Sequence, residues 1–209
     1  MNKFVSLLSG FFFLSVASAV PVSADGRTDG RAAQIVAALA AEFRAMNSYE
    51  VAFEVAMGEH RIAGSYSVEG DCYHLSLGDA EVFADGTTRY EVDNRRQEVT
   101  VVGLDSASRS LLENPVRAFD FLDSGYLPAL SWEHDGLAAV SLTPVDGSGT
   151  LAGNIALVVA TKSMRPQSVV YDFDGEKIEV HILRIGEPRQ AFRAFVRADY
   201  ADYEWIDFR

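Results

Sequence analysis

Short runs of alternating apolar and polar residues, separated by turn residues, are the feature of this sequence that most constrains its fold. In Tyr49–Met57 the large apolar side chains fall on every second residue, so one face of an extended strand would carry all of them. The period recurs in runs at 62–68, 72–77, 81–84, 88–92, 98–102, 137–142, 155–161, 167–173, 177–185 and 191–196. Because a helix repeats every 3.6 residues and not every two, the pattern predicts roughly ten β-strands.

Turn residues divide these runs in the way that an antiparallel meander requires. Gly70, Gly78 and Asp93-Asn94 separate neighbouring runs, whereas Asp85-Gly86 and Asp174-Gly175 each join two runs directly. Asp-Gly pairs favour type I′ turns, in which both central residues have positive φ. We therefore predict an antiparallel hairpin at each of the two Asp-Gly pairs.

Helical patterns occupy two places only. From Arg31 to Met46 the apolar residues Ile35, Leu39 and Phe43 recur every fourth position, which predicts an amphipathic helix. Between 105 and 128 the alternation breaks around Pro115, and proline is accepted in a first helical turn but not in a helix interior. This predicts two short helices, one ending near residue 113 and one over 115–122. The order of elements indicates an α+β fold, in which an antiparallel sheet curls into an open barrel with helices on its apolar side.

The N-terminus has the pattern of a secretory signal peptide. A short basic start at Lys3 precedes an apolar run over 4–16, and small residues suited to signal peptidase end at Ala24. We expect cleavage after Ala24, leaving residues 25–209 as a single domain. No cysteine follows the cleavage site to accept a lipid, and no later stretch is apolar over the ~18 residues of a membrane span. The sequence thus predicts an exported protein that is free in the periplasm.

Composition excludes several classes of partner. The chain has 30 acidic and 18 basic residues, for a formal net charge of -12, and its basic residues are dispersed. Such a surface repels nucleic acid, so we expect no nucleic-acid partner. Cys72 is the only cysteine and cannot form a disulfide within the chain, which leaves stability to packing. The sequence gives no reason to expect more than a monomer.

Motifs that carry catalysis or bind metal are absent from the sequence. It contains no nucleophile elbow, P-loop, dinucleotide fingerprint or zinc-protease motif, and its four histidines have no second histidine or cysteine at ligand spacing. The densest polar group is Glu133-His134-Asp135, where alternation would place Glu133 and Asp135 on one face and His134 on the other. The pair Asp135-Gly136 is typical of a turn. We expect no catalytic residue, no metal and no cofactor.

The order of motifs resembles that of the LolA family of periplasmic lipoprotein carriers. The segment "SYEVAFEV" looks like the family's opening strand, with a central aromatic at Phe53, and "VFADGTTRYEVDNRRQEVTV" is similar to its Asp-Gly, aromatic, Asp and Gln-x-Val run. Further on, "NPVRAFDFL" falls where the family has an Asn-Pro and a leucine-rich helix, and "VSLTP" looks like its Leu-x-Pro strand end. The closing "EWIDFR" resembles the end of a LolA-like branch of the family.

This resemblance implies an unclosed antiparallel β-barrel with a helical lid. It implies a hydrophobic cavity for the acyl chains of a lipoprotein or lipid, accepted from an inner-membrane transporter and passed to an outer-membrane acceptor. The residues expected to line the cavity are Val51, Phe53, Val55, Tyr66, Tyr73, Leu75, Phe83, Tyr90, Val99, Val101, Leu157 and Val159. The residues expected on the lid are Leu111, Leu112, Phe119, Phe121 and Leu122.

The sequence departs from the family pattern after the second strand. Many members have a Pro-Gly and then Phe-Arg-Trp after the second strand, where this chain has Glu69-Gly70 and Cys72-Tyr73-His74-Leu75, so the arginine linked to release is missing. Sequence also cannot distinguish a hollow apolar interior from a filled one, because both use the same residue types. The residues are therefore compatible with three classes of function: a carrier, an envelope binding or assembly protein that uses the fold without lipid, and an enzyme.

Overall fold

The computed structural model describes residues 30–57, 59–104, 125–145, 153–173 and 176–209. These residues form one sheet of twelve strands, the helix α2 (Gly30–Arg44) and the short 3-10 helix η3 (Arg197–Tyr200). The strands are β1 (Ser48–Met57), β2 (His60–Glu69), β3 (Cys72–Leu77), β4 (Ala80–Ala84), β5 (Thr88–Asp93), β6 (Glu98–Gly103), β7 (Tyr126–His134), β8 (Leu137–Pro144), β9 (Ile155–Ala160), β10 (Arg165–Phe173), β11 (Glu176–Gly186) and β12 (Glu204–Asp207).

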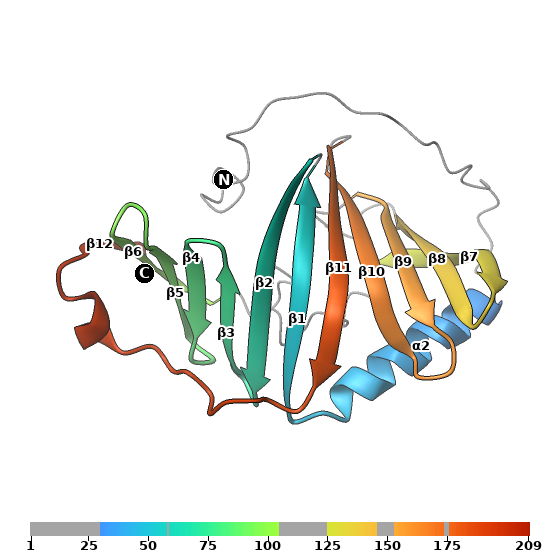
Figure 1. Cartoon of the computed structure of the whole chain (residues 1–209), viewed down its shortest axis with the longest axis horizontal. Helices are drawn as coiled ribbons and strands as arrows, with labels where there is room; N and C mark the ends of the chain where they lie inside the picture. Colours follow the sequence, from blue (N-terminus) through green and yellow to red (C-terminus); the bar gives the residue numbers. More distant parts are fainter. Residues whose placement is uncertain (1–29, 58, 105–124, 146–152, 174–175) are drawn as a thin grey trace.

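The sheet is strongly curved and is not closed (Figure 1). Its strand order is β12-β6-β5-β4-β3-β2-β1-β11-β10-β9-β8-β7, so among the described residues β12 and β7 form the two edges. Neighbouring strands are antiparallel except for β12, which pairs with β6 in parallel. The predicted unclosed antiparallel barrel is therefore confirmed, whereas the predicted lid residues of 105–124 and the signal peptide lie outside the described residues.

Most of the predicted strands are confirmed. Along these strands the hydrophobic alternation and the turn residues indicate the same boundaries. Gly70 and Gly78 have φ of +57° and +58°, which glycine adopts without steric cost at the ends of β2 and β3. The hairpin predicted at Asp174-Gly175 is present as the antiparallel pair β10–β11, whose turn lies outside the described residues. Helix α2 is also confirmed, and it buries Ile35, Leu39 and Phe43 as the period predicts.

The type I′ turn predicted at Asp85-Gly86 is wrong in its geometry. Of the two residues only Gly86 has positive φ, at +89°, and the carboxylate of Asp85 instead accepts the backbone N–H groups of Thr87 and Thr88 at 3.0 and 2.8 Å. In this Asx-type arrangement the aspartate side chain accepts the backbone N–H groups of the turn, so the aspartate itself does not need a left-handed conformation. The two positive φ angles that a type I′ turn requires are found at Asp135 and Gly136, between β7 and β8.

The strand predicted over 191–196 is wrong, and two strands were not predicted. Residues 191–196 have no regular secondary structure, because side chains and not a backbone ladder attach this segment to the sheet. Strand β7 contains Pro128 and a register shift between Leu130 and Trp132, which together hide its alternation. Proline is tolerated there because β7 is an edge strand. Strand β12 is too short to carry a periodic signal.

The two faces of the sheet bury separate apolar clusters. One face, here called the helix face, packs with α2 and includes Tyr49, Val51 and Phe53 of β1. The opposite face of β4–β6, here called the tail face, is covered by the C-terminal tail, residues 187–209, which runs from the end of β11 past β1 to β3 and on to β12 at the sheet edge (Figure 1). Each face buries its side chains in the way that alternation requires.

Candidate functional site

The helix face is a broad apolar surface that extends over β4 to β1 and on to β11 through β8. An aromatic chain links α2 to it, with ring centroids 5.5 Å apart for Phe43 and Tyr49 and 6.0 Å apart for Tyr49 and Tyr66. Burial raises the pKa of the Tyr66 and Tyr171 phenols, so both stay neutral and add no charge to this surface. Eight of the predicted cavity residues pack in this cluster: Val51, Phe53, Val55, Tyr66, Tyr73, Leu75, Leu157 and Val159.

Four predicted cavity residues lie on the opposite face. Phe83, Val99 and Val101 belong to the tail-face cluster, and Tyr90 packs against it. The expectation that all twelve residues line one surface is therefore wrong for these four. Strand β4 explains the error, because its adjacent residues Val82 and Phe83 are both buried, each on its own face, and alternation alone cannot say which face holds the ligand.

Polar side chains replace apolar ones where the helix face reaches β5 and β6. Arg89 and Glu91 of β5 pair in register with Ala84 and Val82 of β4, which belong to the helix-face cluster. Arg89 is 6% exposed, and its Nη2 lies 3.0 Å from Oε1 of Glu91. Across the next pair of strands, Thr100 of β6 lies opposite Glu91. We call Arg89, Glu91 and Thr100 the polar strip.

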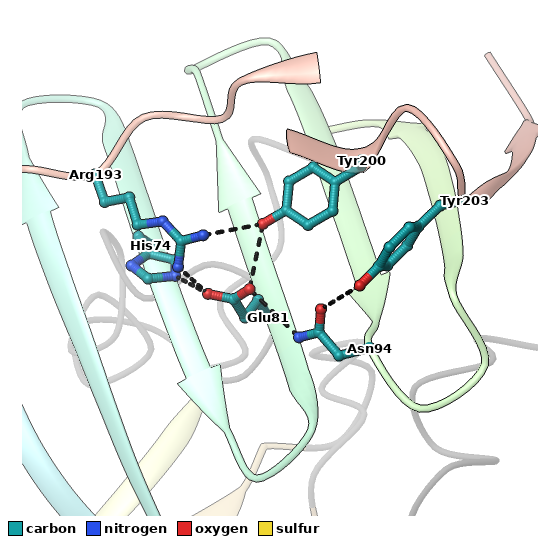
Figure 2. Close-up of polar contacts among 6 residues, drawn as sticks. All are labelled: His74, Glu81, Asn94, Arg193, Tyr200 and Tyr203. Carbon is teal, nitrogen blue, oxygen red and sulfur yellow. Dashed lines mark hydrogen bonds and ion pairs between the residues drawn. The ribbon is translucent and has the colours of Figure 1, made fainter. Parts of the chain in front are cut away.

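Glu81 is the centre of a polar network on the tail face (Figure 2). Its Oε1 accepts from the Arg193 guanidinium and lies 3.1 Å from Nε2 of His74, while its Oε2 accepts from the Tyr200 hydroxyl at 3.2 Å and from Nδ2 of Asn94 at 3.4 Å. Burial acts to raise the pKa of Glu81, but these hydrogen bonds and the charge of Arg193 lower it on balance. An ionised Glu81 can only accept, so His74 donates through Nε2.

The network holds the C-terminal tail together with a stack of aromatic rings. Phe195 of the tail lies between Tyr90 and Tyr200, with ring centroids 4.0 and 5.3 Å away and interplanar angles of 4° and 3°. The Arg197 guanidinium sits 3.8 Å from the ring centroid of Trp205, a cation–π contact. Backbone bonds complete the attachment: Glu204 donates to Gln97 and Phe208 to Val101.

Sequence reasoning did not find this network. Its members Glu81, Asn94 and Arg193 are far apart in the chain, Glu81 and Arg193 by 112 positions, so no spacing brings them together. The only signal was the density of aromatic residues in the last eleven residues. The predicted polar group at 133–135 is not a buried site: Glu133 is bound by Arg31 of α2 at 2.5 and 2.9 Å, and the His134 and Asp135 side chains are exposed.

Acid should weaken the attachment of the tail through His74. Burial lowers the pKa of His74 below its ordinary value of 6.5, although the hydrogen bond to Glu81 opposes this shift. The folded state thus prefers neutral His74, so this contribution to stability is complete above pH 6.5 and is lost as the pH falls through the lowered pKa. Thermal melting from about pH 8 to about pH 5 should show a steeper loss for the native chain than for His74→Gln. Equal slopes would contradict this, and His60→Gln is the control.

Within the part of the chain that the structure describes, no helix is long and apolar enough to cross a membrane, and no group of three or more His, Cys, Asp or Glu residues is placed to hold a metal ion.

The unclosed sheet with a helix on its apolar face has the architecture that the resemblance to the LolA family predicted. In sequence, the chain matches no protein-family model and no curated protein. Its structure is similar to an uncharacterized conserved protein from Thermus thermophilus, with a TM-score of 0.51, 7% identity, and coverage of 84% of this chain and 99% of that one.

Two further solved structures are similar at lower scores. The LolA superfamily protein NE2245 from Nitrosomonas europaea has a TM-score of 0.38 at 14% identity, covering 81% of this chain and 97% of that one. The MucA/MucB complex of Pseudomonas aeruginosa has a TM-score of 0.38 at 17% identity, covering 80% of this chain and 60% of that one. At 7% identity the Thermus likeness is one of fold alone.

Proposed function

We propose that this chain is a non-catalytic periplasmic carrier that shelters the acyl chains of lipoproteins on the helix face and delivers them from the inner to the outer membrane. The observation that carries the proposal is the continuous apolar surface of an unclosed sheet, from β4 through β1 to β8. An acyl chain left in water costs about 0.8 kcal/mol per CH₂ group, so transfer across an aqueous compartment needs an apolar shelter.

As the resemblance to the LolA family implies, we propose that a lid over the cargo includes Leu111, Leu112, Phe119, Phe121 and Leu122, from the sequence between β6 and β7. Strands β6 and β7 lie near opposite edges of the sheet, so this connection joins its two ends. Leu104 and Tyr126, which bracket the segment, both pack in the helix-face cluster. On this proposal the partners are an inner-membrane transporter and an outer-membrane acceptor.

One observation favours a second candidate, an envelope binding or assembly protein that uses this fold without lipid. Central side chains of the helix face are already buried in this structure: Val51, Leu75 and Leu157 are all 2% exposed or less. A carrier must displace part of that packing to admit an acyl chain, whereas a protein that works through its outer surface keeps the core filled. The two candidates therefore differ in whether acyl chains can enter.

Native mass spectrometry of the exported protein, purified gently from its own periplasm and then offered a synthetic diacylated lipopeptide, tests the proposal. We expect a near-stoichiometric acylated ligand after purification, or one-to-one lipopeptide binding by the stripped protein. A clean mass in both conditions would favour the envelope protein without lipid. Extraction and sequencing of the bound material would identify the cargo.

Neighbouring positions on β1 provide a matched pair of variants, because Phe53 points to the helix face and Ala52 to the opposite one. Phe53→Gln should reduce lipopeptide binding at least about tenfold, since it places an amide among apolar groups. Ala52→Gln should leave binding within about twofold. Circular dichroism establishes that each variant is folded, and Leu77→Gln, at a half-buried position, replaces Phe53→Gln if that variant is not. Equal retention by both folded variants would exclude the helix face as the site.

A further inference from the structure

Buried polar residues gather at one end of the helix-face surface. Among the described residues, the polar or charged side chains that are buried are Thr88, Arg89 and Thr100, all on β5 and β6. Arg89 and Thr100 point to the helix face, as their cross-strand partners Ala84 and Glu91 show. The strip of Arg89, Glu91 and Thr100 thus adjoins the apolar surface along the line between β4 and β5.

Burying an ion pair at this position costs free energy of desolvation. The Arg89 and Glu91 side chains are 7% and 20% exposed, so both charges lose most of their hydration on folding. Replacing such a pair by apolar residues of similar volume is often neutral or stabilising, which makes the pair weak evidence for a stability role. Apolar residues would also have continued the surface begun by Val82 and Ala84. A polar end to an apolar surface suits a ligand that is itself apolar along most of its length and polar at one end.

We infer that the polar strip binds the head of the acylated ligand, a head that carries ester or amide carbonyls and N–H or O–H donors but no net negative charge. This inference rests on the proposed function and adds the orientation and class of the ligand to it. The Arg89 guanidinium donates to carbonyl oxygens, Glu91 accepts from amine or hydroxyl groups, and Thr100 can do either. The acyl chains then lie from β4 toward β1, over Val82, Leu75 and Tyr66.

Charge on the helix face of β5 and β6 argues against an anionic head. Asp93 and Glu98 pair across these strands in the same alternation as Glu91 and Thr100, so three carboxylates share the face with the guanidinium of Arg89. Arg96, 3.7 Å from Asp93, is on the exposed turn between the strands. A phosphate head would meet more negative than positive charge, in a chain whose formal net charge is already -12. A free lipopeptide N-terminus is cationic, so the same excess of negative charge attracts it.

The test compares three probes that have palmitoyl chains in common: an S-dipalmitoylglyceryl-cysteine tetrapeptide, dipalmitoylphosphatidylglycerol and palmitate. We expect the native protein to bind the lipopeptide at least about tenfold more tightly than the phosphatidylglycerol. In the double variant Arg89→Met/Glu91→Leu this preference should fall to about threefold or less, while palmitate binding stays within about twofold. The matched control is Arg61→Met/Glu54→Leu, which removes an ion pair of 2.7 Å on the opposite face and should keep the full preference.

Each outcome distinguishes the inference from the function on which it rests. An unchanged lipopeptide preference in a folded double variant that still binds palmitate overturns the inference and leaves the carrier standing. Failure of the native protein to bind any of the three probes overturns both. If the double variant does not fold, Thr100→Val removes one hydroxyl at a position where valine is isosteric, and should lower the preference about threefold. An unchanged preference in that variant is likewise a negative result.

Discussion

Replacing Glu81 by alanine should release the C-terminal tail from the sheet and lower the free energy of unfolding by about 2–4 kcal/mol. The side chain is nearly buried, and its carboxylate accepts hydrogen bonds from Arg193, Tyr200, His74 and Asn94. Its loss therefore leaves several donors without their acceptor. Burial, together with the Glu81 charge, raises the pKa of Tyr200 to about 12, so this hydroxyl remains a donor at all physiological pH values. Denaturant unfolding measures the loss.

Proteolysis reports the release of the tail separately from global stability. Trypsin should cleave at Arg189, Arg193 and Arg197 roughly tenfold faster in Glu81→Ala than in the native chain, because the segment is attached mainly by side chains. Glu81→Gln, which keeps the shape and one carbonyl acceptor, should fall between the two. Glu69→Ala, at an exposed position ending β2, should change neither readout. A normal cleavage rate in a destabilised Glu81→Ala would mean that the aromatic stack holds the tail without the network.

The C-terminal tail shows why the sequence predicted the strands of the sheet better than the segment that packs on one of its faces. Alternation is a local signal, and it located strands such as β3 to the residue because each carries its own period and ends at a turn glycine. Tail residues 191–196 have enough alternation to resemble a strand. They are nevertheless irregular, because Arg193 and Phe195 find partners on β4 and β5 that are more than a hundred residues away in the chain. Long-range pairing of this kind has no local signature.

The sequence predicted which types of residue form the candidate site, but it did not predict on which face of the sheet each of them lies. On β1, polar neighbours such as Glu54 mark the outer side, so Val51, Phe53 and Val55 were assigned to one surface correctly. On β4 one face is buried in the helix-face cluster and the other under the tail, whereas on β5 and β6 the helix face buries Arg89 and Thr100 and the tail covers the opposite face. A strand that is buried on both sides loses its alternation, which is why Phe83, Tyr90, Val99 and Val101 were placed with the wrong neighbours. The buried Arg89 was missed for the same reason.

Gly64→Ala should destabilise the protein by about 1–3 kcal/mol, although the change adds a single methyl group. Gly64 lies directly across from Phe53 between β2 and β1, and a Cβ atom there would come within 2.5 Å of Cζ and 2.6 Å of Cε2 of the Phe53 ring and 3.1 Å of Cδ1 of Leu77. The ring is buried in the helix-face cluster, so it cannot move aside into solvent. Denaturant unfolding of the variant measures the cost.

A double-mutant cycle with Phe53→Leu ties this cost to the ring. If the methyl group clashes with the aromatic edge, the two changes together should destabilise by about 1 kcal/mol less than the sum of the single effects. Gly103→Ala is the control, because a Cβ atom at Gly103 meets nothing within 4 Å, and its effect should stay within about 0.5 kcal/mol. Additive effects at 53 and 64 would show that the ring can tilt within the cluster. That result would also make Phe53 a side chain able to move aside for an acyl chain on the helix face.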